Sequence, residues 1–138
     1  MSPFHADSRR YTEALAEFRS TLRAFLRFSE EAAVQAGLTP QQHQLLLQIA
    51  GAPEGTGTTV GYLAEKLALR HNSVVELGDR CVEAGLAVRL RDGRNRRHVV
   101  LKLTDQGASM LQKLSEVHYR ELNELGPQLI GTLKTLIG

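Results

Sequence analysis

Positive charge is concentrated in one stretch of the chain, residues 87–102. Six basic side chains fall there: Arg89, Arg91, Arg94, Arg96, Arg97 and Lys102. They stand against a single acid, Asp92, so the local balance is +5, whereas the other 122 residues hold 11 basic and 14 acidic side chains. A basic cluster on a mildly acidic body is typical of a surface that binds a polyanion. A solvated arginine-rich loop would give the same pattern, so charge alone leaves both interpretations open.

The same stretch has the pattern of a β-hairpin. Apolar residues alternate over residues 87–91 and again over residues 98–103, which indicates two strands. Residues 92–97, with the sequence Asp-Gly-Arg-Asn-Arg-Arg, have the composition of a turn. The sequence therefore predicts a hairpin with guanidinium groups at its tip, which suits a narrow and electronegative DNA minor groove.

Two short helices are predicted before this hairpin. Thr59 suits the N-cap of a helix over about residues 60–67. After a break, a second helix is predicted from about residue 71 to 84, with Gly85 as its C-terminal stop. Two short helices joined by a tight turn make a helix-turn-helix, and a hairpin that directly follows such a pair is a wing.

The front of the second helix carries side chains that are able to contact DNA. His71, Asn72 and Ser73 stand there, where side chains and backbone N–H groups can reach bases and phosphates. Asn and Ser also begin helices of every kind, so ordinary capping is the alternative. Arg80, farther along the same helix, is a candidate phosphate partner.

Arg94 is the main candidate at the hairpin tip. Asp92, two residues earlier across the turn, can hold its guanidinium in one orientation, which lowers the cost of ordering it in a groove. The alternative is a surface ion pair of little worth. Arg91 is expected to contact phosphate, and Arg96 and Arg97 either do the same or form salt bridges between the wing and the body of the domain.

Long amphipathic helices are predicted on both sides of this region. Residues 6–35 carry apolar side chains at helical spacing, and so do residues 105–125. Gly126 and Pro127 are expected to interrupt the second of these helices before a short last helix at 128–137. Because the apolar stripes exceed what one small subunit can cover, a second subunit is expected to cover the rest.

A further helix start is marked at Thr39. Gly37 ends the preceding helix, and Thr39, Pro40 and Gln42 fit the N-cap, the first helical turn and the reciprocal capping-box position. The sequence therefore predicts a helix over about residues 40–50.

Other classes of protein fit the sequence less well. No apolar run approaches the roughly 18 residues that a membrane span needs, and the polar N-terminus lacks an apolar signal segment. We therefore expect a cytoplasmic protein that is not bound to a membrane. We find no Gly-rich phosphate loop, nucleophile motif or plausible carboxylate pair, and so predict neither enzymatic activity nor a cofactor.

The cysteine and the histidines also argue against redox and metal sites. The chain has a single cysteine, Cys81, which falls on the predicted buried face of its helix and is expected to be an apolar core residue. A redox sensor, the alternative, needs an exposed thiol of low pKa. The five histidines are scattered without an i,i+4 pair, so we predict no structural metal site.

Taken in order, these motifs resemble the MarR family of bacterial transcriptional regulators. The resemblance extends over residues 38–107, about half of the chain. The segments that carry it are residues 38–42, 59–67, 72–74, 79–80, 83–86, 92–97 and 103–107. No single segment is diagnostic, but the ordered set is specific.

The resemblance implies a dimer joined by the N- and C-terminal helices, with recognition helices in the major groove and wings in the flanking minor groove. It also implies that a small ligand, often an aromatic or phenolic compound, relieves DNA binding. His43 follows a helix start where the family often has an aromatic residue, so it is a candidate for lining a ligand pocket. A half-buried core histidine is the alternative.

Three residues depart from the family pattern. Arg70 stands where a small N-capping residue is usual. Glu76 replaces a frequent arginine or polar residue on the DNA-facing side, where an acid repels phosphate but can accept a hydrogen bond from cytosine N4. Gly78 replaces a bulky aliphatic residue, which weakens the helix by up to about 1 kcal/mol.

The sequence thus predicts a mainly α protein with a small β-wing, arranged as one domain over residues 1–138. Residues 38–104 form a winged helix-turn-helix lobe that binds DNA, and residues 6–35 and 105–138 form dimerisation helices. We expect a ligand-responsive repressor that binds a palindromic operator in double-stranded DNA as a homodimer. The alternative is a winged-helix module for protein interaction that does not bind DNA, which Glu76 and the low net charge favour.

Overall fold

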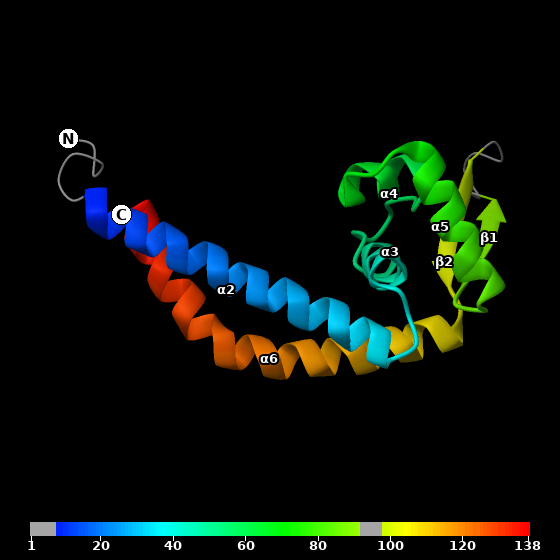
Figure 1. The fold of residues 1–138 in the computed structure, drawn as a ribbon. Coiled ribbons are helices and arrows are strands. Elements are labelled where there is room, and N and C mark those ends of the chain that lie inside the picture. The colour runs from blue at the N-terminus through cyan, green and yellow to red at the C-terminus, as the bar shows by residue number, and fades with distance from the viewer. Residues whose placement is uncertain (1–7, 92–97) are drawn as a thin grey trace. The chain divides into compact units, whose positions relative to one another are not determined.

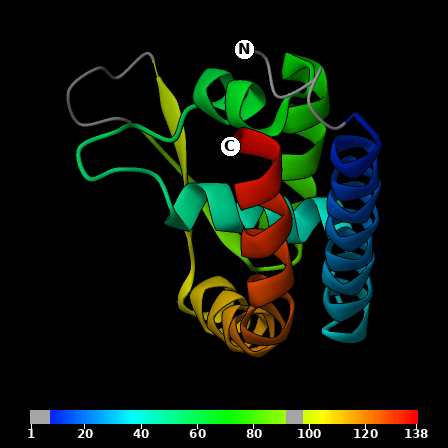
Figure 2. The ribbon, with the colours of Figure 1, turned by 90° about the vertical axis from the view of Figure 1, so that its left-hand side faces the viewer.

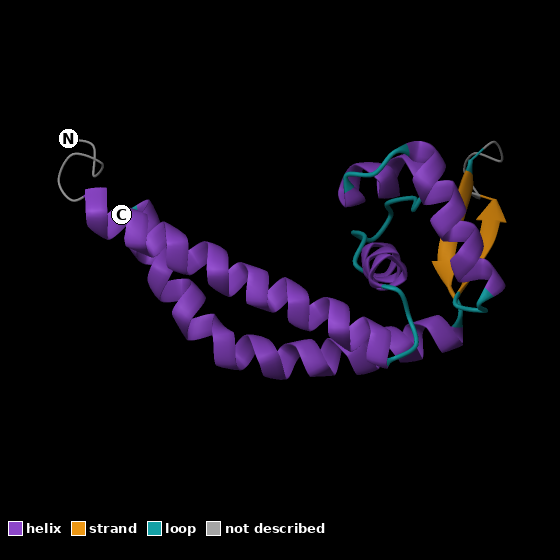
Figure 3. Ribbon diagram, viewed as in Figure 1, coloured by secondary structure: helices purple, strands orange, loops and turns teal. Residues whose placement is uncertain are grey.

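The computed structural model describes residues 8–91 and 98–138 of the chain. The elements in chain order (Figure 1) are α2 (Ser8–Gln35), α3 (Pro40–Ala50), α4 (Val60–Leu67), α5 (His71–Glu83), β1 (Ala87–Arg91), β2 (Val99–Leu103) and α6 (Asp105–Ile137). Helices dominate and the two strands form one small antiparallel sheet, which is the predicted fold class (Figure 3). None of the described helices combines the length and the apolar character that crossing a membrane requires.

The chain divides into two compact units, Ala33–Ser115 and a unit made of the terminal segments up to Ala32 and from Glu116 onward. In the Ala33–Ser115 unit, α3, α4 and α5 contact one another, and β2 contacts α3 and α4. Apolar residues at helical spacing give these helices a common buried side, and their removal from water stabilises the unit. The buried apolar residues of this unit are Ala33, Leu38, Leu45, Leu46, Ile49, Leu63, Val74, Leu77, Cys81, Leu86, Ala87, Val100, Leu101, Leu111 and Leu114.

The predicted capping residues are confirmed at the starts of α3 and α4. The Thr39 hydroxyl accepts a hydrogen bond from the Gln42 N–H (3.1 Å), and the Gln42 side chain accepts one from the Thr39 N–H (2.9 Å), which completes the capping box. The Thr59 hydroxyl accepts a bond from the Tyr62 N–H (3.1 Å) at the start of α4. Gly37 follows α2 with φ +92°, a left-handed conformation that glycine adopts without steric cost.

The predicted interruption at Gly126 and Pro127 is wrong, because α6 continues through both residues. A proline inside a helix removes one backbone hydrogen bond and crowds the carbonyl four residues earlier, at about 3 kcal/mol. The apolar stripe nevertheless continues at helical spacing on both sides of the proline, where Leu125, Leu129 and Leu136 are partly buried. Packing along this stripe outweighs the local preference for a break.

In the terminal unit, α2 and the part of α6 that begins at Glu116 meet at His118. Its Nε2 lies 2.7 Å from the Ser29 hydroxyl, and the rings of Phe25 and Phe28 stand edge-on to its imidazole at centroid distances of 5.9 and 5.6 Å. The hydrogen-bonded pair of His118 and Ser29 therefore lies beside two phenylalanine rings. Several large apolar side chains of the unit are exposed: Leu15, Leu26, Leu122, Ile130, Leu133 and Ile137.

Candidate nucleic-acid interface

α4 and α5 form the helix-turn-helix that the sequence predicts. After α4, Ala68 has φ 53°, a left-handed conformation that costs a residue other than glycine about 1–2 kcal/mol. The N–H groups of Ala68 and Leu69 donate back to α4 carbonyls at 3.3 and 3.0 Å, which stabilises the turn. α5 then begins at His71, as predicted, directly after the N-cap residue Arg70.

α5 has one buried and one exposed side, as its apolar spacing predicts. The side in the core carries Val74, Leu77, Gly78 and Cys81. The predicted DNA-contacting residues of this helix are all exposed: His71, Asn72, Ser73, Glu76 and Arg80. The exposed side therefore offers a row of polar groups along a regular helix.

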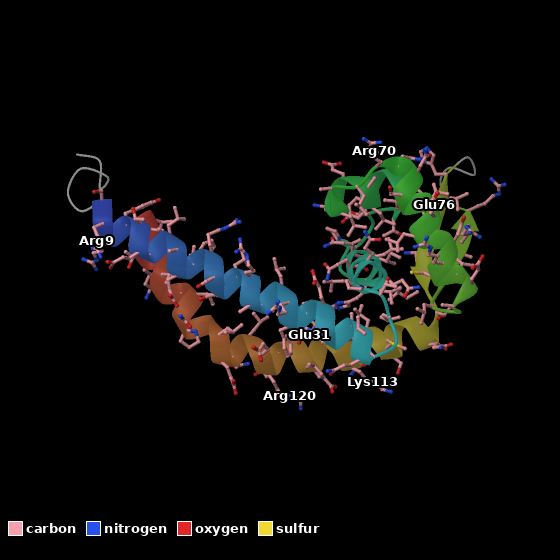
Figure 4. All side chains as sticks on the ribbon, in the orientation of Figure 1. Arg9, Glu31, Arg70, Glu76, Lys113 and Arg120 are labelled. Atoms are coloured by element: carbon pink, nitrogen blue, oxygen red, sulfur yellow. The ribbon has the colours of Figure 1, made fainter. Side chains whose placement is uncertain are left out.

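The start of α5 differs from the starts of α3 and α4. Arg70 occupies the N-cap position with extended backbone, and its side chain makes no capping hydrogen bond with the described residues. This side chain is exposed and points away from the unit (Figure 4). The first turn of α5 is exposed as well, so its N–H groups and a nearby guanidinium both favour an anion.

β1 and β2 pair as the predicted hairpin, although β2 starts at Val99, one residue later than expected. A third segment pairs with the other side of β2. The Leu101 N–H donates to the Thr58 carbonyl (3.0 Å), and the buried Thr58 hydroxyl donates to the Leu101 carbonyl (2.5 Å). Figure 2 shows the loop after α3 projecting beside the hairpin before the chain reaches α4. β2 is therefore held on both edges, which anchors the hairpin to the unit.

The stem of the hairpin is exposed and basic. Arg91 on β1 and Lys102 on β2 are both exposed. Arg89 of β1 forms an ion pair with Asp79 of α5, an interaction that the spacing of residues in the sequence does not indicate. The residues predicted at the hairpin tip lie outside the described part of the chain: Asp92, Arg94, Arg96 and Arg97.

Backbone contacts behind α5 connect the helix-turn-helix to the start of α6. Gly85 follows α5 with φ +77°, and the Leu86 N–H donates to the Cys81 carbonyl (2.9 Å), which ends the helix. The Thr104 hydroxyl donates to the Gly85 carbonyl (2.6 Å) and accepts from the Gly107 N–H (3.0 Å). Gly107 itself lies directly against the Leu86 backbone. These contacts fix where α5 ends relative to the hairpin and the first turn of α6.

His43 and Cys81, the candidates for a ligand pocket and a redox site, both lie inside the Ala33–Ser115 unit. His43 is 3% exposed, on the buried side of α3. Cys81 is fully buried, as predicted, and burial raises the pKa of its thiol to about 11. Because the thiolate is the reactive form of cysteine, this residue is an inert member of the core at neutral pH.

The sequence pattern of the MarR family matches residues 36–98, which include α3, α4, α5 and β1. Residues 36–98 form a MarR-family domain. A Thauera aromatica protein assigned to transcriptional regulation of the hcr operon is 27% identical to the chain over 121 residues. That match covers 87% of this chain and 71% of the relative, so it extends beyond the MarR-family domain.

Solved structures have a similar fold. Wild-type MarR from E. coli, in its apo form, is similar with a TM-score of 0.70 and 24% identity, over 86% of this chain and 90% of that one. A point mutant of S. aureus MepR, bound to an oligodeoxyribonucleotide, has a TM-score of 0.67 and 17% identity, over 87% and 92%. At these identities the likeness establishes the fold, and the predicted winged helix-turn-helix is confirmed.

Proposed function

We propose that this chain is a DNA-binding transcriptional regulator, a ligand-responsive repressor that acts as a homodimer. The observation that carries this proposal is the exposed polar side of α5, which lies next to a basic hairpin. An α-helix fits the major groove of B-DNA, and a neighbouring hairpin reaches the flanking groove. The similar fold of MepR, which was bound to an oligodeoxyribonucleotide, supports this use of the domain.

The proposed contacts divide by chemistry. Contacts to base edges determine sequence preference, and contacts to phosphates fix register and orientation. The residues proposed to contact bases, or phosphates near the start of α5, are His71, Asn72, Ser73 and Glu76. The residues proposed to contact phosphates or the minor groove are Arg80, Arg91, Arg94, Arg96 and Arg97.

Replacing Arg94 by alanine is expected to weaken duplex binding, because it removes a guanidinium from the predicted tip of the wing. The loss should be on the order of 1–3 kcal/mol. The matched control is Arg9→Ala, since Arg9 of α2 is exposed and pairs with Glu13 of the same helix (3.1 Å). Fluorescence anisotropy on one labelled duplex measures both affinities, and equal affinities for the two variants would exclude the wing tip from the interface.

The protein is expected to be a dimer in solution, because large apolar side chains are exposed in the terminal unit. Ile130 is 56% exposed and Leu26 is 51% exposed, and covering such side chains stabilises a dimer. Light scattering should give twice the chain mass of 15.2 kDa at micromolar concentration. Ile130→Arg should shift the mass toward the monomer, and Glu124→Arg, an exposed site on the same helix, should not. A stable monomeric mass for the unaltered protein would contradict the proposal.

We also propose which segments of the chain bind DNA and which form the dimer. Residues 38–104 would bind DNA, and residues 6–35 and 105–138 would join two copies. A two-fold dimer presents two identical α5 helices, so its operator should be an approximate palindrome with half-sites about one helical turn apart. Since such a protein acts on chromosomal DNA, we place it in the cytoplasm.

We further propose that the effector is a small aromatic or phenolic compound, on the strength of the family resemblance. His43 is the candidate for a residue of its binding site. His43 lies on the inward side of α3, and α3 contacts α5. A ligand bound beside His43 would therefore affect DNA binding through the packing between these two helices. The second function, a protein-interaction module, is favoured by the acid Glu76 on α5 and by the low net charge, and it predicts no measurable duplex binding at low salt.

A further inference from the structure

Asp79 of α5 and Arg89 of β1 form an ion pair. The pair links two elements that already contact each other, the helix α5 and the strand β1 (Figure 1). Each side chain is 47% exposed. Exposed ion pairs contribute little to the stability of a whole domain. The importance of this pair therefore depends on what it holds in place.

The pair lies where α5 and the hairpin are incompletely packed. Leu101 of β2 approaches α5 closely at Gly78, since its Cδ1 is 3.1 Å from the position that a Cβ on Gly78 would take. Beside this contact there is a mainly apolar hollow of about 50 Å³, and Asp79 and Arg89 belong to its lining. Because protein interiors are close-packed, such a gap leaves the hairpin less constrained by side-chain contacts. The ion pair supplies a second link between helix and hairpin next to the gap.

The pair also changes the charge that α5 presents. Asp79 follows Glu76 by three residues, so the two carboxylates lie on the same side of the helix. Two unpaired carboxylates there would repel a phosphate backbone, and the guanidinium of Arg89 neutralises one of them. Arg89 belongs to the basic cluster, but its engagement with Asp79 indicates a role other than phosphate contact.

We propose that Asp79 is a positioning residue for DNA binding. Through Arg89 it fixes the hairpin relative to α5, so that the helix and the hairpin engage one duplex at the same time. This inference rests on the proposed function. Asp79 acts through Arg89 and is not itself a contact to bases or phosphates.

The test compares Asp79→Asn with Glu83→Gln. Glu83 is an exposed acid four residues later on α5, so both variants remove one negative charge from the same side of the helix. The probes are a duplex selected from a random pool by the unaltered protein, and the unselected pool itself. Affinities are measured by fluorescence anisotropy at one salt concentration.

The proposal and simple electrostatics predict opposite results. Electrostatics alone predicts that both variants bind both probes more tightly. Positioning predicts that Asp79→Asn binds the selected duplex about fivefold more weakly, while Glu83→Gln does not, because an exposed ion pair is worth up to about this factor. Arg89→Gln should cause at least this loss, because it also leaves the Asp79 carboxylate unpaired, and the double variant should be no worse than Arg89→Gln. Asp79→Glu, which keeps the carboxylate, should bind the selected duplex like the unaltered protein. Identical behaviour of Asp79→Asn and Glu83→Gln on both probes would overturn the proposal.

A second measurement needs no DNA. Amide hydrogen exchange in the free protein should be faster in β1 and β2 for Asp79→Asn than for Glu83→Gln, because the hairpin loses its link to α5. Equal protection in the two variants would overturn the positioning role. If the unaltered protein fails to bind the random pool at low salt, the proposed function is wrong, and the exchange result still decides whether Asp79 holds the hairpin.

Discussion

Replacing Gly107 with alanine is expected to lower the free energy of unfolding by about 3 kcal/mol, at the upper end of the cost of overpacking. Gly107 is buried in the first turn of α6, where a Cβ would overlap the Leu86 carbonyl oxygen and lie 3.0 Å from the Leu86 carbonyl carbon. Backbone atoms cannot move aside as the end of a flexible side chain can. The added methyl group must therefore separate the first turn of α6 from the end of α5.

The matched control is Gly61→Ala on α4. Gly61 is also helical and in the same compact unit, but a Cβ there meets only the Thr59 hydroxyl oxygen at 3.9 Å, an ordinary contact. This variant should be neutral or more stable by up to about 1 kcal/mol, because alanine favours helix over glycine. Thermal unfolding at equal protein concentration should separate the two variants by roughly 10 °C or more. Similar melting temperatures would contradict the close approach of α6 to Leu86.

The largest expected effect is the loss of DNA affinity with salt. Seven basic side chains per subunit are candidates for phosphate contact: Arg70, Arg80, Arg89, Arg91, Arg96, Arg97 and Lys102. We expect three to five of them to be used, with Arg89 the least available because it pairs with Asp79. A dimer would then neutralise roughly six to ten phosphates, and log affinity should fall against log salt with a slope of about −5 to −9. Between 50 and 200 mM salt this amounts to a loss of about 10³- to 10⁵-fold. Because Arg89 pairs with Asp79, the slope should lie toward the shallow end of this range.

Glu76→Gln provides the companion measurement. Removing a carboxylate from the exposed side of α5 should raise affinity for random duplexes, because it removes repulsion from phosphate. It should also narrow the difference between the selected duplex and random DNA, if Glu76 accepts a hydrogen bond from cytosine. Anisotropy titrations of both proteins across salt concentrations test this directly. A flat salt response, or no binding at 50 mM salt, would favour the protein-interaction module.

Local sequence signals predicted the parts of this fold that depend on neighbouring residues. Two helices begin where the sequence predicts, at Thr39 and at Thr59. In each case the threonine hydroxyl accepts a hydrogen bond from the N–H group three residues later, and at Thr39 the Gln42 side chain accepts one in return. Gly85 ends α5 for a similarly local reason. The exposed side of α5, which carries most of the described candidate contacts, followed from helical spacing alone.

The features that were predicted wrongly or not at all are those that depend on residues far apart in the sequence. Pro127 is a strong local signal for a break, but packing on both sides of it keeps α6 continuous. Thr58 bonds to Leu101 across 43 positions, and this pairing was not predicted from the sequence. Two adjacent β-branched threonines were the one available signal for that short strand pairing. The Asp79–Arg89 pair joins a helix to a strand, and no periodicity within either element indicates it.

The burial of Cys81 makes its chemistry depend on motion. Burial raises the pKa of this thiol to about 11, so very little of it is thiolate at neutral pH, and alkylating and oxidising reagents attack the folded protein slowly. Faster attack requires α5 to detach from the core, so the rate of modification follows the frequency of that opening. A duplex or a small molecule that binds only while α5 is packed on the core would then slow the modification of the sulfur atom without contacting it.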